Sequence, residues 1–130
     1  MKTVADILSS KHDRDVHTTT PTTSVLAAMQ LMATKGIGAL VVVEGDQVVG
    51  IITERDYARR TEVEARRGRD TLVRDIMTAP VIRVRPDHTS EDCIVLMAQN
   101  KLRHLPVMDR DALLGIVSIR DLVDNIIERL

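Results

Sequence analysis

The chain has almost no aromatic side chains and a single cysteine. Its 130 residues contain no Trp, no Phe and one Tyr, Tyr57, so the core has to be aliphatic. The lone Cys93 excludes an internal disulfide framework. No apolar run approaches the ~18 residues of a membrane span, and the polar residues 9–12 interrupt what would be the apolar region of a signal peptide. We therefore expect a cytoplasmic protein with no membrane partner.

The chain also lacks a charge excess of either sign. Eighteen Lys and Arg face nineteen Asp and Glu, which gives a formal net charge of −1. A protein that holds a polyanion usually presents a strong positive field, so DNA is disfavoured as a partner. The histidines at positions 12, 17, 88 and 104 do not have the spacing of a metal site, and no metal is expected. The sequence shows no nucleophile elbow and no Walker loop, so we expect no enzymatic activity.

What the chain does contain is an internal repeat. The sequence matches itself at a spacing of 65 residues, as between Val16 and Val81, without a slip of register as far as Asp121. Further matched pairs are Pro21 and Pro86, Leu40 and Leu105, Gly50 and Gly115, and Arg55-Asp56 and Arg120-Asp121. Such a repeat predicts one supersecondary unit that occurs twice, with pseudo-twofold symmetry and a cleft between the halves.

The hydrophobic period changes in the same order within each repeat and predicts β-α-β-β-α twice. Short apolar segments at 4–8 and 73–77 predict a small helix ahead of each repeat. Each repeat is then expected to begin with a strand, at 16–18 and at 81–84. A helix follows, capped by a hydroxyl residue at 22–24 in the first repeat and by Thr89 or Ser90 in the second. A hairpin comes next, at 39–43 with 48–52 and at 104–108 with 113–117. The closing helices are expected from Glu54 to about Arg67 and from Ile119 to the C-terminus.

The segments that carry chemistry are Gly-Ile-Ile-Thr-Glu-Arg-Asp at 50–56 and Gly-Ile-Val-Ser-Ile-Arg-Asp at 115–121. Each lies where a buried strand leads into a helix. A hydroxyl residue followed three positions later by an acid resembles a capping box, which starts a helix without any ligand. A helix N-terminus at the end of a strand is equally the usual construction of a phosphate site. Two copies that face one cleft favour the binding interpretation.

These two segments, with the stretches 36–41 and 103–107, resemble the CBS (cystathionine-β-synthase) domain family. The resemblance covers residues 3 to 130. It implies an α/β fold of the α+β type, with one repeat at 3–69 including the N-terminal helix and another at 70–130. Together the two repeats would form one Bateman module. In this family the cleft holds up to two ligands such as AMP, ATP, NAD(H) or S-adenosylmethionine.

Carried over by position, the resemblance implies two sites that each draw on both halves. In each site the acid would bind the ribose, and the hydroxyl residue would bind a phosphate. The isoleucine two residues before the hydroxyl residue would contact the base, and the arginine next to the acid would be a possible phosphate contact. The first site comprises Ile51, Thr53, Arg55, Asp56, Val81, Arg103 and His104, and the second comprises Val16, Ile37, Gly38, Ile116, Ser118, Arg120 and Asp121. Because Arg103 and His104 offer positive charge to the first site, we expect that site to hold phosphates better.

The sequence thus favours a regulatory module that binds an adenine nucleotide and signals in trans to a partner protein by a conformational change. The last helix carries an apolar stripe, which comprises Leu122, Val123, Ile126, Ile127 and Leu130. The stripe either packs on its own domain or, as the resemblance implies, joins two modules as a homodimer. The alternative function is an interaction scaffold without a ligand. The arginine-rich stretch at 59–69 is interpreted as a solvated connector or a contact for an anionic partner, and Cys93 as a small core residue.

Overall fold

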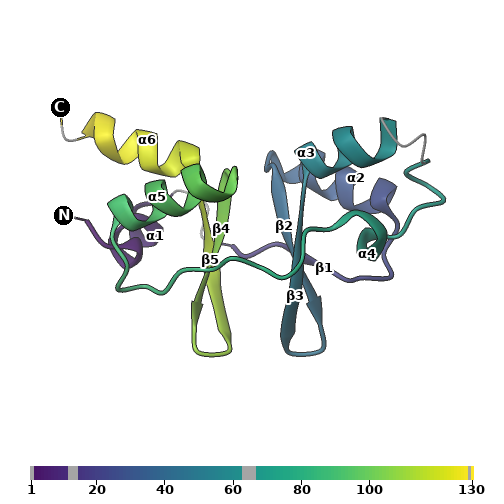
Figure 1. Ribbon diagram of the computed structural model, residues 1–130, viewed down its shortest axis with the longest axis horizontal. Coiled ribbons are helices and arrows are strands. Elements are labelled where there is room, and N and C mark those ends of the chain that lie inside the picture. Colours follow the sequence, from purple (N-terminus) through teal and green to yellow (C-terminus); the bar gives the residue numbers. More distant parts are fainter. Residues whose placement is uncertain (1, 12–14, 63–66, 129) are drawn as a thin grey trace. The chain divides into compact units, whose positions relative to one another are not determined.

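The computed structural model describes residues 2–11, 15–62, 67–128 and 130 (Figure 1). The described chain forms two compact units. One consists of His17–Val81 and is called here the first-repeat unit; the other, the second-repeat unit, consists of Met1–Val16 together with Ile82–Leu130. Both units contain a helix, an antiparallel hairpin and a closing helix in the same order, and a leading strand is formed in the first-repeat unit. The predicted fold class, which mixes helices and strands in two repeats, is confirmed.

The first-repeat unit is built on a three-stranded sheet in the order β1-β2-β3. Strand β1 runs parallel to β2, and β2 and β3 form an antiparallel hairpin. Its elements are β1 (Thr18–Thr19), α2 (Val25–Lys35), β2 (Ala39–Glu44), β3 (Gln47–Thr53), α3 (Glu54–Tyr57), a π-helical turn (Ala58–Glu62) and α4 (Val73–Ile76). The predicted closing helix is therefore shorter and partly π-helical, and its predicted residues 63–66 lie outside the described part.

The second-repeat unit has the same plan around the antiparallel hairpin β4-β5. Its elements are α1 (Val4–Ser10), α5 (Ser90–Asn100), β4 (His104–Asp109), β5 (Ala112–Ser118) and α6 (Ile119–Glu128). The prediction of a hydroxyl cap at 22–24 and at Thr89 or Ser90 is confirmed, and the caps are Ser24 and Thr89. Their side chains accept hydrogen bonds from the amides of Ala27 and Asp92. A hydroxyl at this position satisfies an N–H group that has no partner within the helix.

Structural irregularities recur at the repeat spacing. A register shift falls between Val42 and Val43 in one hairpin and between Val107 and Met108 in the other. Left-handed backbone ends α2 at Gly36 and α5 at Lys101, and it recurs in the hairpin turns at Gly45 and Arg110. The two units therefore share local backbone geometry as well as element order.

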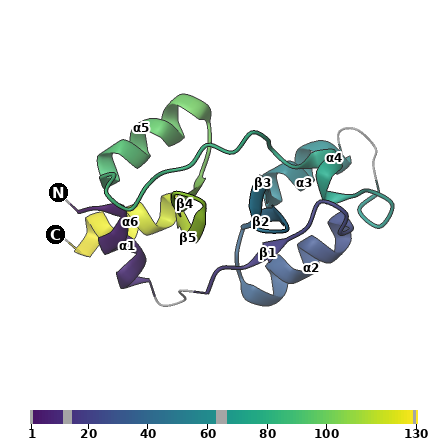
Figure 2. The ribbon, with the colours of Figure 1, turned by 90° about the horizontal axis from the view of Figure 1, so that it is seen from below.

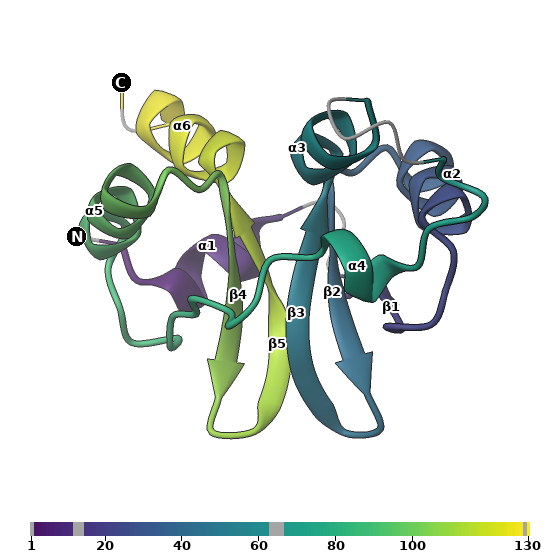
Figure 3. The same cartoon turned by 45° about the vertical axis from the view of Figure 1, so that its right-hand side comes forward.

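The small leading helices each pack on the repeat that they do not precede in the sequence. Helix α1 belongs to the second-repeat unit, where the amide of Val4 donates to the His88 carbonyl at 2.8 Å. Helix α4 belongs to the first-repeat unit, where the amide of Val73 donates to the Thr23 carbonyl at 2.8 Å. Figure 3 shows α4 against β3, and Figure 2 shows α1 beside α6. The compact units thus differ from the repeat boundaries 3–69 and 70–130, since α1 lies in the second-repeat unit and α4 in the first-repeat unit.

The first strand of each repeat was wrongly placed by the sequence. Val16 is exposed and lies before β1, which pairs only Thr18 and Thr19 with β2. Segment 81–84 forms no strand, and only Val84 pairs, through a parallel bridge to Val107. The paired residues lie close to Pro21 and Pro86, which have no N–H group to extend the ladder.

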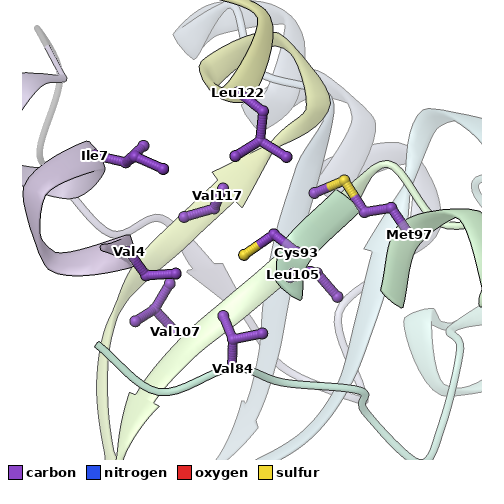
Figure 4. Close-up of a cluster of buried hydrophobic side chains, with 9 residues drawn as sticks. All are labelled: Val4, Ile7, Val84, Cys93, Met97, Leu105, Val107, Val117 and Leu122. Carbon is purple, nitrogen blue, oxygen red and sulfur yellow. The ribbon is translucent and has the colours of Figure 1, made fainter. Parts of the chain in front are cut away.

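Each unit has its own aliphatic core. In the second-repeat unit, α1, α5 and α6 contribute side chains that meet those of β4 and β5 (Figure 4); the buried cluster is Val4, Ile7, Val84, Cys93, Met97, Leu105, Val107, Val117 and Leu122. Cys93 is fully buried in it, as predicted, and burial raises the pKa of its thiol to about 11. The first-repeat cluster is Val25, Ala28, Met32, Leu40, Val42, Ile52, Val73 and Ile76.

Candidate functional site

The first motif forms the junction of β3 and α3. One carboxylate oxygen of Asp56, Oδ2, accepts hydrogen bonds from the Thr53 amide at 2.9 Å and the Thr53 hydroxyl at 3.1 Å. The Thr53 Oγ1 atom in turn accepts from the Asp56 amide at 3.1 Å. The other carboxylate oxygen, Oδ1, accepts from the hydroxyl of Thr78 at 3.1 Å. Asp56 is therefore tied to its own helix and to the segment after α4.

The second motif repeats this geometry where β5 leads into α6. The Asp121 carboxylate accepts from the Ser118 amide at 2.8 Å, and the Ser118 hydroxyl oxygen accepts from the Asp121 amide at 3.1 Å. The long-range partner is charged here, because the ammonium of Lys11 lies 3.1 Å from Asp121 Oδ2. Lys11 also donates to the carbonyl oxygen of Ile116 at 2.7 Å. The segment after α1 thus places a cation at the second motif.

The local geometry of both motifs is that of a capping box, as the ligand-free interpretation predicted. The same reciprocal bonds join Thr3 to Asp6 at the start of α1 and Thr89 to Asp92 at the start of α5. Hydrogen bonds from these threonine residues hold the pKa of Asp6 and Asp92 below the usual value of an aspartate. What distinguishes Asp56 and Asp121 is their position after a buried strand and their long-range partners, Thr78 and Lys11.

Within each unit a second segment lies beside the motif. The Glu54 amide donates to the Gly38 carbonyl at 3.1 Å, which places Ile37 and Gly38 next to the Asp56 motif. The Ile119 amide donates to the Arg103 carbonyl at 2.9 Å, which places Arg103 next to the Asp121 motif. The sequence assigned these segments across the halves, so that Arg103 would serve Asp56 and Gly38 would serve Asp121. That assignment stays a prediction.

His104 is paired with Ser118 in the β4-β5 ladder. Burial lowers the pKa of its imidazole from 6.5; the Asp121 carboxylate opposes this shift, while the nearby cations Lys11 and Arg103 add to it. The folded environment therefore favours the neutral form of the His104 imidazole relative to a free one.

The remaining predicted site residues differ in exposure. Ile51 is buried, with 6% of its surface exposed, whereas Ile116, Ile37 and Val81 are half-buried. Arg55 and Arg120 are exposed on their helices, and Arg120 lies 3.9 Å from the Asp124 carboxylate. The isoleucines thus suit an apolar wall, while the arginines lie in solvent.

A hollow of about 470 Å³ lies between α1 and α6 in the second-repeat unit. This volume is in the range of small-molecule sites. The hollow is lined by Ile7, Ser10, Lys11, Arg120, Asp121, Asp124, Asn125, Ile127 and Glu128. Sequence reasoning missed Lys11, Thr78 and Asn125. The leading helices were interpreted only as packing elements, and for the last helix only its first turn was assigned to a site.

Comparison with known proteins assigns both repeats to one family. The family model described as CBS domain matches residues 4–62 and 73–128. A solved CBS-domain protein from Burkholderia ambifaria MC40-6 has a TM-score of 0.94 at 47% identity, covering 98% of this chain and 95% of that one. The CBS domain-containing protein YhcV of Bacillus subtilis (strain 168) is 35% identical over 96% of this chain and 86% of its own length. CBSX2, solved in complex with AMP, has a TM-score of 0.79 at 27% identity and covers 98% of each chain.

Other curated relatives are longer than the matched region, which is 65% of one and 57% of another. Some are enzymes that contain the CBS pair as a small part, since the chain matches only 21% of an inosine-5'-monophosphate dehydrogenase from Thermoplasma acidophilum. In the part of the chain that the structure describes, no helix is both long and apolar enough to cross a bilayer. The chain belongs to the CBS domain family and contains a pair of CBS domains.

Proposed function

We propose that this protein is a regulatory module that binds an adenine nucleotide at its two strand-to-helix motifs, with AMP the first candidate. The observation that carries the proposal is the repeated geometry of Asp56 and Asp121, each held at the end of a buried strand by a partner from a distant segment. The AMP complex of CBSX2, similar in fold and over nearly the whole chain, supports AMP as the ligand. ATP, NAD(H) and S-adenosylmethionine are the other candidates.

The motifs offer the groups that a nucleotide requires. The carboxylates of Asp56 and Asp121 can accept from ribose hydroxyls, as acidic side chains do in dinucleotide-binding folds. The hydroxyls of Thr53 and Ser118 lie at the start of a helix, where anions are favoured. Isoleucines 51 and 116 precede them by two residues and supply apolar surface for a base. We propose no catalytic role and no metal for these residues.

The proposed output is a change in the arrangement of the halves that a partner protein detects. A ligand can shift such an equilibrium only by its differential affinity for the two arrangements. Helix α6 supplies a candidate contact surface, because Ile119, Val123 and Ile126 are each 40% to 46% exposed. Leu122 is buried at 1% exposure, so the predicted stripe is divided between core and surface. We propose that the exposed part joins two copies as a homodimer.

One observation favours the scaffold as a second candidate. Both motifs are complete capping boxes without any ligand, so Thr53 and Ser118 have a structural role whether or not a nucleotide binds. A scaffold would require the exposed face of α6 but not the carboxylates of Asp56 and Asp121. The two candidates therefore differ in what substitution of Asp56 or Asp121 does to binding.

A panel of thermal unfolding curves separates the two. AMP, ATP, NAD, NADH and S-adenosylmethionine are each added in excess. A ligand at about 100 times its Kd stabilises the folded state by about 2.7 kcal/mol, which raises the Tm measurably. Asp92→Ala is the matched control for Asp121→Ala, since both lose a capping box. The sensor predicts a Tm shift that Asp92→Ala retains and that the double variant Asp56→Ala/Asp121→Ala loses. If none of the compounds shifts the Tm, the sensor proposal fails and the scaffold is the remaining candidate function.

A further inference from the structure

Helix α1 docks on the turn 85–88 of the second repeat. The Val4 amide donates to the His88 carbonyl at 2.8 Å, and the Ala5 amide donates to the Pro86 carbonyl at 3.0 Å. These bonds hold the helix where Val4 lies fully buried in the second-repeat core (Figure 4). The turn is therefore the socket of α1.

The first repeat contains the same socket in its turn 20–23. The Val73 amide donates to the Thr23 carbonyl at 2.8 Å, and the Arg74 amide donates to the Pro21 carbonyl at 3.0 Å. Helix α4 thus docks on the first repeat through the same two backbone bonds that α1 makes to the second. One chain holds two copies of this joint, and each is a reference for the other.

The two sockets differ in the last side chain of the turn, which is Thr23 in one and His88 in the other. The Thr23 hydroxyl pairs with the Thr20 hydroxyl at 2.7 Å. The half-buried imidazole of His88 instead folds back on its own turn, where its Nδ1 atom accepts from the Arg85 amide at 2.8 Å. Only a neutral imidazole can accept at Nδ1, because the imidazolium carries a proton on both ring nitrogens. Histidine changes its charge near neutral pH, whereas threonine does not.

Neighbouring charges act on His88 against this amide bond. The pKa of Asp87 is lowered by its hydrogen bond to Arg85 and that of Asp92 by the Thr89 amide, and the charge of His88 contributes to lowering both. By the same interaction the two carboxylates favour the imidazolium, whereas the Arg85 amide favours the neutral ring. The other charged groups near the socket are Glu91 at the start of α5, Lys2, which pairs with Glu128 at 3.7 Å, and Asp6, which accepts from the Thr3 amide at 3.1 Å.

Few buried side chains hold α1 in place. Two of its seven residues, Val4 and Ile7, are buried, and a hollow of about 470 Å³ lies between α1 and α6. Elements with few buried contacts open at a lower free energy than the whole fold. Loss of one hydrogen bond in the socket is therefore enough to shift the docking of α1 measurably.

We propose that His88 makes the docking of α1 pH-dependent, so that protonation of its imidazole releases α1 while α4 stays docked on the first repeat. The docked geometry uses the neutral ring, so the docked state binds fewer protons than the released state. Docking then weakens as the pH falls through about 6.5, where free imidazoles take up a proton. Lys11 directly follows α1 and lies 3.1 Å from Asp121, so release of α1 also withdraws this cation from the second motif.

Amide hydrogen exchange followed by NMR at pH 7.5 and pH 5.5 tests the proposal, with each rate divided by the intrinsic rate at that pH. The Val4 and Ala5 amides report on the second socket, and the Val73 and Arg74 amides report on the first. We expect protection at Val4 and Ala5 to fall about fivefold relative to Val73 and Arg74 on acidification, as loss of one hydrogen bond implies. The midpoint of this fall should coincide with protonation of His88, followed through its ring nitrogen signals.

Substitutions of histidine separate His88 from other groups that titrate. His88→Asn places an acceptor, Oδ1, where Nδ1 lies and does not titrate, so it should abolish the fall. His88→Thr copies the residue of the first socket and should abolish it as well. His17→Asn, which removes a histidine from the first-repeat unit, should keep it. A fall that both His88 variants retain, an unsubstituted chain without a fall, or an equal fall at all four amides would each overturn the proposal.

Discussion

Gly50 lies against Met77: a Cβ atom placed on Gly50 would come 2.6 Å from Met77 Sδ and 3.1 Å from the Thr78 carbonyl oxygen. The equivalent glycine of the other hairpin, Gly115, faces Leu8, whose Cδ2 atom would be 3.0 Å away. Both contacts bring the end of a leading helix onto the strand that precedes a strand-to-helix motif. Glycine at these two positions therefore lets the distant segments reach Asp56 and Asp121.

The first prediction concerns these glycines. Gly50→Ala should lower the free energy of unfolding by about 1–3 kcal/mol, because overpacking of a filled site forces neighbouring groups to move. Gly115→Ala should cost less, since its nearest contacts are the mobile methyl groups of Leu8. Urea denaturation measures both. Gly68→Ala is the matched control, with its nearest contact at 3.5 Å, and a Gly50→Ala chain as stable as that control would contradict the packing account.

The second prediction uses the repeat itself. Gly45 and Arg110 occupy the same place in the two hairpin turns with φ of 60° and 55°, a conformation that costs side chains other than glycine about 1–2 kcal/mol. Arg110→Gly should therefore stabilise the fold by up to about 1 kcal/mol, and Gly45→Arg should destabilise it by a similar amount. Thermal unfolding of the two variants gives the comparison. If Arg110→Gly and Gly45→Arg both lower the stability, the left-handed backbone of the turn does not determine the effect of these substitutions.

The third prediction is a pH dependence at His104. Because its pKa is lowered in the folded state, the unfolded chain binds more protons below about pH 6.5, and stability rises with pH through this window. Acidification from pH 7.5 to pH 5.5 should thus destabilise the wild type more than His104→Gln. The free energy of unfolding in urea at several pH values provides the test. Equal losses in the two chains would mean that His104 does not contribute.

The fourth prediction concerns the thiol. Cys93 is fully buried and its pKa is raised to about 11, so the native protein should react slowly with a thiol reagent at pH 8. Addition of urea should release the full reactivity over the same range as the loss of helical circular dichroism. Rapid, complete labelling of the native chain would show that the second-repeat core opens readily.

Much of this fold could be predicted from the sequence, because the hydrophobic period and the turn residues act locally. Such local signals predicted both hairpins and a hydroxyl cap at 22–24 and at Thr89 or Ser90, and the structure selects Ser24 and Thr89. The repeat also predicted that two copies of one motif, around Thr53 and Ser118, would share a geometry. Their capping bonds confirm this for each copy.

What the sequence could not supply was the choice of partner between distant segments. An amphipathic pattern shows that α1 has a buried face, but it does not tell which repeat covers that face. The Lys11 and Asp121 side chains meet only because α1 packs on the second repeat. The lowered pKa of His104 likewise depends on burial and, to a smaller extent, on the charge of Lys11, which follows α1. Long-range packing thus decided the features that were missed.

The most direct test of the nucleotide-sensing account is calorimetric titration of the chain with AMP, repeated with Asp56→Ala, Asp121→Ala and the capping control Asp92→Ala. The account predicts saturable AMP binding by the unsubstituted chain and by Asp92→Ala. Each single motif variant should bind AMP with lower stoichiometry or affinity, and the double motif variant should not bind it. Binding that survives in the double variant, or no heat with a folded chain freed of bound nucleotide, would contradict it.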